Sequence, residues 1–561
     1  MLPRLDMDVI YFILLIGPLV FVHELGHFLV AKAFRIKVLK FSLGFGPLMI
    51  GKQWGETYYQ IAWIPLGGFV RFLGDDPRED VLPRDRARTF LSAAAWKRAL
   101  VVFAGPCMSL LFPVLCYFAV GMMIDELAPP TIGEVVPETP AERAGMRAGD
   151  RVVSVDGEPI YGFSDLQDAI SSRPGEDLSI VVQRGDERLT LSVRPTLVKR
   201  ARFPMFDIFE EVGQLGIHGV YPAPVIGVPS ASSPAARAGL RTFDLVTGVD
   251  GRPTRRWIDL EQVLADAIPG RPMEVSYLRT QQTGWAFADV FVHEPGRATV
   301  TPAAGEGGRA DVGVELASLY VSHVLAGWPG DVAGLRPGDK IVAVDGHAIR
   351  VWVQFVDAIN RVPDQPHRIS VVRGGEELTA ELRLERRTRN DRYGGEVVDY
   401  RPGIGVFRAY TVDDPVPNPN RIARAAVGAV RETVEVIHFM AIGIMRMLQG
   451  RVSCESIGGP IMLFEIAGTA GRQGAHSFLS VLALISVNLG LLNLLPVPVL
   501  DGGHLMLLGV ETVRRRPLSL KAREIVNLVG LGLLILLMVF AFKNDIQRYW
   551  DWEDVTSLFG E

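Results

Sequence analysis

Residues 23–27 read HELGH, and they combine two possible metal ligands with one possible base. In an α-helix His23 and His27 lie one turn apart on the same face, so both imidazoles could bind one zinc ion. Glu24 lies between them and could accept a proton from water activated by that ion. The alternative is a helix that carries two incidental histidines, and it weakens if the chain supplies a third ligand.

The HELGH motif lies inside a long apolar segment, not on a polar helix. Residues 9–31 contain no other charged side chain and are long enough to cross a bilayer. Ionisable side chains are costly at that depth, and by default they mark function. The sequence therefore favours a zinc hydrolase that works within a membrane.

Four segments pass the length test for a membrane-spanning helix: residues 9–31, 99–124, 478–500 and 525–542. The chain has 561 residues, of which 48% are hydrophobic, and this composition fits a soluble part joined to membrane spans. The first segment is too long, and too lacking in a small-residue cleavage site, to be a cleaved signal peptide. The formal net charge of -5 gives no indication of nucleic-acid binding. Three scattered cysteines exclude a disulfide framework.

Basic residues between the spans predict the orientation of the chain. Twelve lysines and arginines separate the first two spans, and five separate the last two. By the positive-inside rule both connections are cytoplasmic. Both termini and the long segment from residue 125 to residue 477 then lie on the opposite side. The HELGH motif falls in the cytoplasmic half of the first span.

The segment between the second and third spans contains a threefold repeat. Residues 140–157 match residues 234–251 and 329–346. Each copy runs from a helical turn through a tight turn and an apolar strand to Asp-Gly, a strong turn signal. The second copy differs, because Phe243 stands where the others have the glycine that precedes an aspartate.

The repeat resembles PDZ domains of the bacterial protease type. This resemblance implies that each copy could bind the C-terminus of a peptide by adding it to a sheet edge. The alternative is that the copies are steric spacers with unused grooves, and binding is least expected for the second copy. After the repeat, residues 421–448 have apolar side chains at helical spacing, with Arg424, Arg431 and Arg446 interspersed. They could form an amphipathic helix in the membrane interface or pack against the other domains.

The third metal ligand is expected at the end of the third span, where residues 488–504 read NLGLLNLLPVPVLDGGH. Pro496 and Pro498 cannot continue a regular helix, so the backbone should open near Pro496. Asp501 follows at the cytoplasmic end of this span and would face the HELGH motif. Two histidines, one aspartate and an open position for water are what catalytic zinc requires. Asp501 could instead cap a helix, and His504 is expected to support a ligand rather than bind the ion.

HELGH in the first span together with NLLPVPVLDGGH in the third resembles the site-2 protease family of intramembrane zinc metalloproteases. PDZ-like units between the second and third spans make the chain similar to the regulator-of-sigma-E branch of that family. The similarity extends to residues 41–47, 65–71, 103–106 and 458–460. It implies that His23, His27 and Asp501 bind Zn²⁺ and that Glu24 is the general base.

The same resemblance implies how a substrate is held. Asn488 and Asn493 would contact an unwound substrate, and a membrane-associated β-loop around residues 58–72 would pair with it. Two features depart from the family: three PDZ-like units where two are usual, and Ser109 where asparagine is frequent.

The resemblance also implies a location and a substrate class. The location would be the bacterial inner membrane, with the PDZ domains and both termini in the periplasm and the catalytic site near the cytoplasmic side. The partners would be the lipid bilayer and single-span membrane proteins already cut on their outer side, such as anti-sigma factors, or remnant signal peptides. A PDZ layer over the active site would exclude intact, bulky ectodomains.

The predicted fold is a multi-pass α-helical membrane protein with four transmembrane helices and three inserted, extracytoplasmic, β-rich PDZ domains. Residues 1–124 hold the first two transmembrane helices, and residues 456–561 hold the last two. The three PDZ domains are predicted at residues 128–198, 222–302 and 311–388, and amphipathic helices at residues 415–455.

The sequence leaves two other functions to consider. A PDZ-carrying serine protease would use Ser456, but an isoleucine separates Ser456 from the Gly-Gly pair and no triad histidine context precedes it. A catalytically silent membrane scaffold would use its PDZ units to bind exported peptides. That reading leaves Glu24 and Asp501 at membrane depth without a role.

Overall fold

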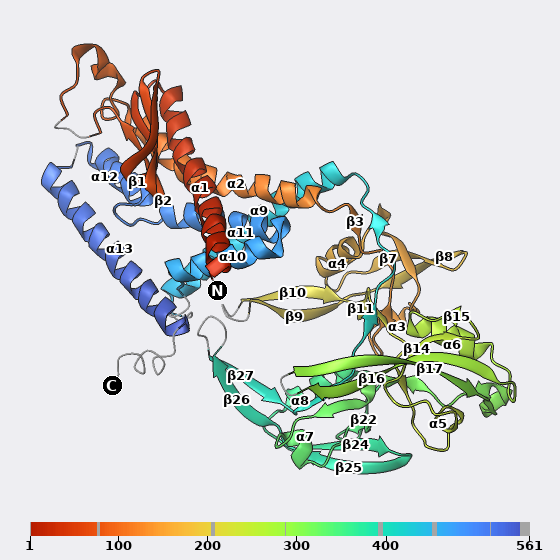
Figure 1. The fold of residues 1–561 in the computed structure, drawn as a ribbon. Helices are drawn as coiled ribbons and strands as arrows, with labels where there is room; N and C mark the ends of the chain where they lie inside the picture. Colours follow the sequence, from red (N-terminus) through yellow and green to blue (C-terminus); the bar gives the residue numbers. More distant parts are fainter. Residues whose placement is uncertain are drawn as a thin grey trace, which may run out of the picture.

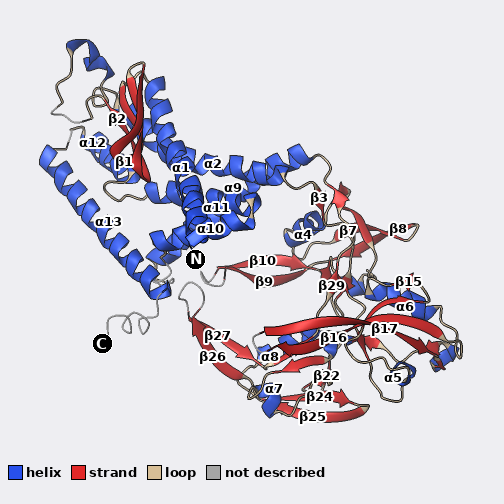
Figure 2. Cartoon of the chain, in the orientation of Figure 1, coloured by secondary structure: helices blue, strands red, loops and turns tan. Residues whose placement is uncertain are grey.

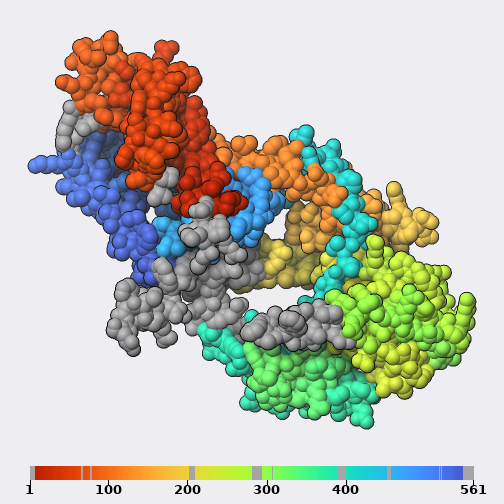
Figure 3. Space-filling view, viewed as in Figure 1, coloured from red at the N-terminus to blue at the C-terminus, as the bar shows by residue number. Residues whose placement is uncertain are grey.

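The computed structural model describes residues 2–75, 79–203, 208–285, 288–390, 396–450, 457–516 and 518–549. The long helices gather in one part of the molecule together with β1 and β2, and most other strands gather in another (Figures 1 and 2). The space-filling view shows the helical lobe in red and blue and the β-rich lobe in yellow to cyan (Figure 3). Ser456, on which the serine-protease alternative depends, lies outside the described residues.

Within the described part of the chain, four helices are long and apolar enough to cross a membrane. They are α1 (Leu2–Ala33), α2 (Ala95–Met122), α11 (Ala475–Asn493) and α13 (Leu520–Tyr549). The third was predicted to continue to residue 500, but α11 ends at Asn493 and α12 (Asp501–Arg514) begins eight residues later. The predicted opening of the backbone near Pro496 is therefore confirmed, since the two prolines cannot donate the hydrogen bonds of another helical turn.

The helices pack closely around the HELGH motif. A buried apolar cluster joins α1, α2, α10 (Pro460–Gln473) and α11 through Leu15, Cys116, Ala467 and Leu482. Next to the motif, a Cβ atom added to Gly26 would lie 2.3 Å from the carbonyl oxygen of Ala104. Since only glycine permits this approach, Gly26 brings α1 and α2 into backbone contact beside the histidines.

A β-hairpin follows α1 and lies against it. Strands β1 (Val38–Trp54) and β2 (Thr57–Phe72) curl, so that Phe41 pairs with both Tyr59 and Val70. A Cβ atom at Gly68 would lie 2.7 Å from Val20 and 3.0 Å from Cγ of Glu24, so the end of β2 runs directly along α1. The predicted β-loop at residues 58–72 thus coincides with β2 and borders the HELGH motif.

The threefold repeat folds into three similar units, called unit 1, unit 2 and unit 3 in chain order. Their four-stranded sheets have equivalent orders, β6-β5-β7-β8, β15-β14-β16-β17 and β23-β22-β24-β25. Equivalent repeat positions are buried in each core, as at Val152, Val246 and Ile341. A helix packs on each sheet: α4 (Phe163–Ser171), α6 (Trp257–Ala265) and α8 (Trp352–Arg361).

The remaining elements of the units have the following bounds. Unit 1 has β4 (Glu134–Val135), α3 (Pro140–Arg143), β5 (Arg151–Val155), β6 (Glu158–Pro159), β7 (Leu178–Arg184), β8 (Glu187–Val193), β9 (Thr196–Phe203), β10 (Ile208–Gln214) and β11 (Ile217–His218). Unit 2 has β13 (Ile226–Gly227), α5 (Pro234–Arg237), β14 (Leu245–Val249), β15 (Arg252–Pro253), β16 (Met273–Trp285), β17 (Ala288–Val300), β18 (Ala303–Ala304), β19 (Ala310–Asp311) and β20 (Glu315–Leu316). Unit 3 has β21 (Val321–Val324), α7 (Pro329–Val332), β22 (Lys340–Val344), β23 (His347–Ala348), β24 (His367–Arg373), β25 (Glu376–Leu382), β26 (Glu385–Asn390), β27 (Glu396–Arg401) and β28 (Ile404–Val406).

Each unit is completed by a strand beyond the limits expected from the sequence. Strand β11 pairs with β4, β20 with β13, and β28 with β21. Leu215, Val312 and Ile404 are accordingly buried in the three cores, although they follow residues 198, 302 and 388. An intervening hairpin separates these strands from the recognisable repeat, which explains why the repeat pattern stops short of them.

Phe243, which replaces a glycine of the repeat, keeps the backbone of that glycine. Its φ is +76°, close to +91° at both Gly149 and Gly338. The following aspartate is still buried and paired, because Asp244 accepts hydrogen bonds from Arg279 at 2.8 and 2.7 Å. The turn of the second copy is therefore retained, although Phe243 must adopt a left-handed backbone conformation that is unfavourable for a bulky side chain.

After unit 3 the chain returns past the other units to the helices. Strand β29 (Tyr410–Thr411) pairs with β12 (Tyr221–Pro222), and β30 (Val416–Pro417) pairs with β3 (Glu126–Leu127). Helix α9 (Arg421–Leu448) then follows, with the bounds expected for the amphipathic helix. A Cβ atom at Gly121 of α2 would lie 2.8 Å from Cβ of Ala425, so α9 packs directly on α2. Whether α9 also lies in the membrane interface remains a prediction.

Candidate metal centre

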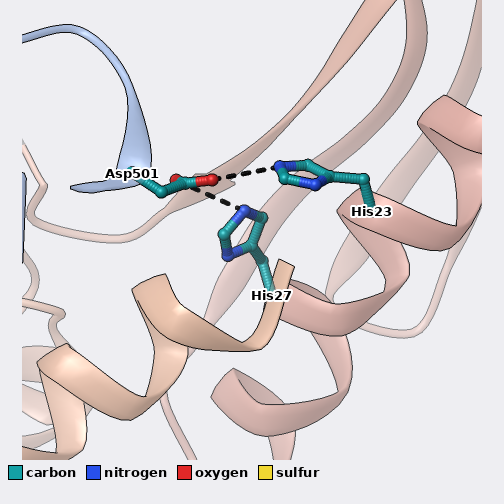
Figure 4. A group of neighbouring side chains, drawn as sticks. All are labelled: His23, His27 and Asp501. Carbon is teal, nitrogen blue, oxygen red and sulfur yellow. Dashed lines mark ion pairs between the residues drawn. The ribbon is translucent and has the colours of Figure 1, made fainter. Parts of the chain in front are cut away.

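His23, His27 and Asp501 converge from two helices that are far apart in the sequence (Figure 4). Nε2 of His23 lies 3.1 Å from Oδ2 of Asp501, and Nε2 of His27 lies 3.5 Å from Oδ1. One ligand atom from each residue lies within 4.8 Å of the other two. Because α1 presents both histidines on one face and Asp501 begins α12, the geometry follows from the helical spacing and the break after α11.

The other ring nitrogen of each histidine is held by a neighbour on α2. Nδ1 of His27 donates to the carbonyl oxygen of Val101 at 2.8 Å, and Nδ1 of His23 lies 3.0 Å from Oγ of Ser109. A carbonyl oxygen can only accept, so His27 carries its proton on Nδ1 and leaves the lone pair of Nε2 free. Such partners fix the tautomer and orientation of histidines that bind metals.

Ser109 is itself fixed by a further hydrogen bond. It is fully buried, and its carbonyl oxygen accepts the hydroxyl proton of Ser486 on α11 at 2.6 Å. The sequence marks Ser109 as a departure from the family but does not predict this contact with His23. A polar residue in an otherwise apolar span was the available signal.

Gly105 makes room for the imidazole of His27. A Cβ atom at Gly105 would lie 2.3 Å from Nε2 of His27, far inside van der Waals contact. Any other residue would therefore displace the ring from the cluster. Gly105 is a second site residue that sequence reasoning alone did not assign.

The segment before Asp501 depends on the two glycines that follow it. Cβ atoms at Gly502 and Gly503 would lie 2.2 Å from the carbonyl oxygens of Leu495 and Val497. The glycines thus let the preceding loop pack against the start of α12. Val499 in that loop has φ of +84°, which is strained for a β-branched residue and typical of a functional site.

The cluster opens into a cavity of about 580 Å³. Its lining includes Glu24, the end of β2 at residues 67–70, Asn493 and His504. Glu24 is only 9% exposed, and the backbone amide of Val70 faces its carboxylate. The amide nitrogen of Asn493 lies 3.4 Å from Nε2 of His23. The cavity thus places a carboxylate, an amide and a strand edge around the candidate ligands.

The structure brings together most of the residues that the sequence singles out. His23, Glu24, His27, Asn493, Asp501 and His504 all line the cavity, whereas Asn488 is not part of its lining. Asn488 precedes Asn493 by more than one turn of α11, so it faces a different direction.

The donor set fits a zinc ion. Two imidazole nitrogens and one carboxylate oxygen are the ligand types of catalytic zinc, and three protein ligands leave the fourth position open. In both histidines Nδ1 is engaged in a hydrogen bond with α2, and Nε2 is directed at Asp501. Binding of a metal through Nε2 needs this arrangement. Zinc bound here would supply Lewis acidity and activate a water molecule.

Replacing Ser109 with alanine tests the orientation of His23. We expect zinc affinity to fall about 10–100-fold, because the imidazole loses the partner that holds its ring. Competition with a chromophoric chelator on the purified protein measures this change. Ser480→Ala is the matched control, because the Ser480 hydroxyl donates to the carbonyl oxygen of His476 within α11. Equal affinity in Ser109→Ala and wild type would show that the serine does not orient His23.

Comparison with known proteins adds independent information. A family model described as peptidase family M50 matches residues 11–537. A protein of Vibrio cholerae named "Putative zinc metalloprotease" is 28% identical over 541 residues, covering 96% of this chain and 98% of its own. A protein of the same description from Neisseria meningitidis is 30% identical over 541 residues, with the same coverage. The regulator of sigma-E protease of Escherichia coli is 28% identical over 552 residues, covering 96% of this chain and 98% of its own.

The chain also matches solved structures, one of which contains a PDZ domain. A PDZ-domain protein from Parabacteroides distasonis matches 50% of this chain and 95% of its own at 10% identity. Its TM-score is 0.12, so this likeness carries no argument about the fold.

Proposed function

Because this chain belongs to peptidase family M50, we propose that His23, His27 and Asp501 bind its zinc ion and that Glu24 is its general base. The chain is a zinc metalloprotease of the intramembrane, site-2 type. The observation that carries the residue assignment is the convergence of three donor atoms within 4.8 Å beside the buried Glu24. A silent scaffold would not require this arrangement.

Glu24 performs the proton transfers in the proposed mechanism. Its carboxylate accepts a proton from the attacking water and later delivers it to the amine that leaves the cut peptide bond. Glu24 is buried yet lines the cavity, so its carboxylate can meet a water molecule held there. His23 and His27 are held by Ser109 and Val101, so their Nε2 atoms stay directed at the reaction centre.

The substrate is proposed to unwind before it is cut. A peptide bond within a helix is shielded by its own hydrogen bonds, and at membrane depth each broken bond needs a new partner. The edge of β2 at residues 67–70 and the amide of Asn493 line the cavity and can supply such partners. Asn488, five residues earlier on α11, lies outside this lining, so its proposed contact would be with a part of the substrate outside the cavity.

We place the catalytic site near the cytoplasmic side of the bacterial inner membrane. The basic residues of the first and last connections support this orientation, with the three units and both termini in the periplasm. We assign all three units as PDZ domains, because they share one strand order and equivalent buried positions.

The proposed substrates are single-span membrane proteins that have already lost their outer domain. Pre-cut anti-sigma factors and remnant signal peptides are the two proposed classes, and the relatives named regulator of sigma-E protease agree with a link to sigma-factor regulation. The three units would exclude bulky ectodomains by occupying the space over the membrane helices. Binding of peptide C-termini in their grooves is an additional proposed role.

The site of cleavage tests this function. The full-length protein in proteoliposomes should cut a clipped single-span substrate inside its apolar segment, as mass spectrometry of the products would show. A zinc chelator should stop the reaction, and added zinc should restore it. A cut outside the apolar segment, or a reaction indifferent to the chelator, would contradict the proposal.

A further inference from the structure

Two arginines of α9 contact two aspartates on the helix of unit 1. Arg424 donates through Nη1 and Nη2 to the two carboxylate oxygens of Asp165, at 3.0 and 2.7 Å. Arg431 donates to Asp168 at 2.5 Å. Arg424 and Arg431 are seven residues apart and so share a face of α9, while the aspartates lie one turn apart on α4. These contacts join the β-rich lobe to the helical lobe.

The pair between Arg424 and Asp165 is partly shielded from water. The two side chains are 29% and 21% exposed, compared with 65% and 57% for the pair between Arg194 and Asp177 in the same unit. Burial raises the pKa of Asp165, but hydrogen bonds from Arg424 and from the backbone N–H of Gly162 outweigh it and lower that pKa. A bidentate, half-buried arginine–carboxylate pair is stronger and more directional than an exposed ion pair.

The opposite face of α4 is in close contact with the segment that completes unit 1. A Cβ atom at Gly219 would lie 2.8 Å from the ring of Phe163, and one at Gly213 would lie 2.3 Å from the carbonyl oxygen of Ile170. Phe163 and Ile170 lie at the beginning and near the end of α4. Both ends of α4 therefore touch this segment, and α4 serves here as a structural link between unit 1 and α9.

Helix α9 is also attached to α2, the helix that supplies hydrogen-bond partners to both histidines. Ala425 packs against Gly121 of α2, and Arg421 forms an ion pair with Asp125 just after α2. The same α2 supplies Ser109 and the carbonyl oxygen of Val101 to the metal centre. Unit 1 is thus joined through α9 to α2, which orients the two histidines.

We propose that Arg424 and Arg431 are positioning residues that fasten unit 1 to α9 and thereby determine which substrates reach the metal centre. This inference rests on the proposed function, in which the units filter substrates by size. When the ion pairs hold, unit 1 has a fixed place beside α2 and α9. When they are broken, unit 1 is attached through β3 and the return strand β30 and can move away from the helices.

The charges can be reversed one pair at a time. Arg431→Asp and Arg424→Asp each place two like charges in contact and should release unit 1. We expect cleavage of a substrate with an intact ectodomain to rise about tenfold relative to a clipped substrate, a change equivalent to about 1.4 kcal/mol. Cleavage of the clipped substrate should change less than about twofold, because no catalytic contact is altered. Arg194→Asp, which reverses an exposed pair inside unit 1, is the matched control and should leave the ratio unchanged.

Charge exchange separates a positioning role from a folding defect. The double variant Arg431→Asp with Asp168→Arg should return the ratio to the wild-type value. This pair is preferred for the exchange because Asp165 also accepts hydrogen bonds from the backbone of Tyr161 and Gly162 at the start of α4. Distances between spin labels on unit 1 and α9 in the same variants should lengthen with the single change and recover with the exchange.

The outcomes distinguish this inference from the proposed function. If wild type does not cut the clipped substrate, the proposed function itself is wrong. If wild type cuts it but Arg424→Asp and Arg431→Asp leave both the ratio and the label distances unchanged, the ion pairs do not position unit 1. A change in the single variants that the exchange fails to reverse also contradicts the inference.

Discussion

Glutamine in place of Glu24 is expected to lower the rate of cleavage by about 10²–10⁴-fold while zinc remains bound. The amide has the shape of the carboxylate but cannot accept the proton of the attacking water. The candidate ligands His23, His27 and Asp501 are untouched, so metal binding should be preserved. Initial rates on a clipped single-span substrate in proteoliposomes, with zinc measured by mass spectrometry on the same preparation, give both quantities.

A matched control separates this effect from a general cost of losing a charge. Glu465→Gln removes a carboxylate from an exposed position on α10, away from the cavity, and should leave the rate within about twofold of wild type. A Glu24→Gln variant that cuts at the wild-type rate would remove Glu24 from the mechanism. Loss of zinc from this variant would instead indicate that Glu24 is a ligand.

Asparagine in place of Asp501 is expected to remove zinc and, with it, all measurable cleavage. Asp501 is the only candidate ligand that carries a negative charge, and it comes from α12, whereas both histidines come from α1. Its loss should weaken zinc binding by more than the about 10–100-fold typical of losing an outer partner such as Ser109. The variant should keep its fold, because asparagine fills the same volume and is itself a good residue at a helix start.

Full activity with normal zinc content in Asp501→Asn would remove Asp501 from the ligand set, although Leu500 and not Asp501 is the N-cap of α12. Partial activity that increases with added zinc would agree with a weakened ligand set. His504→Gln provides a comparison one turn further along α12. It should retain zinc, because His504 lines the cavity without belonging to the cluster of donor atoms.

The parts of the candidate metal centre were predictable because each depends on local rules. Helical spacing fixes the relation of His23 to His27, and the prolines at 496 and 498 fix the end of α11 before Asp501. The long apolar segments likewise predict the spanning helices. These features are encoded within short windows of the chain, where periodicity and backbone restrictions act directly.

The contacts that orient the centre were not predictable in the same way. Ser109 meets His23 and Gly105 meets His27 only because α1 and α2 cross at Gly26, and the sequence alone does not specify a crossing point. The strands that complete the three units were missed for a related reason. A hairpin of unrelated sequence separates each closing strand from its repeat, so pairing across that hairpin is a tertiary event.

The most direct test of the account is the zinc content of the purified protein, compared between wild type and Asp501→Asn and combined with X-ray absorption at the zinc edge. Wild type should hold one zinc ion per chain, with two nitrogen ligands at about 2.0–2.1 Å and oxygen ligands at about 2.0–2.2 Å. Asp501→Asn should hold little or none under the same conditions. A wild-type protein without zinc, or one with unchanged zinc and ligand distances after Asp501→Asn, would contradict the assignment of His23, His27 and Asp501 as the metal centre.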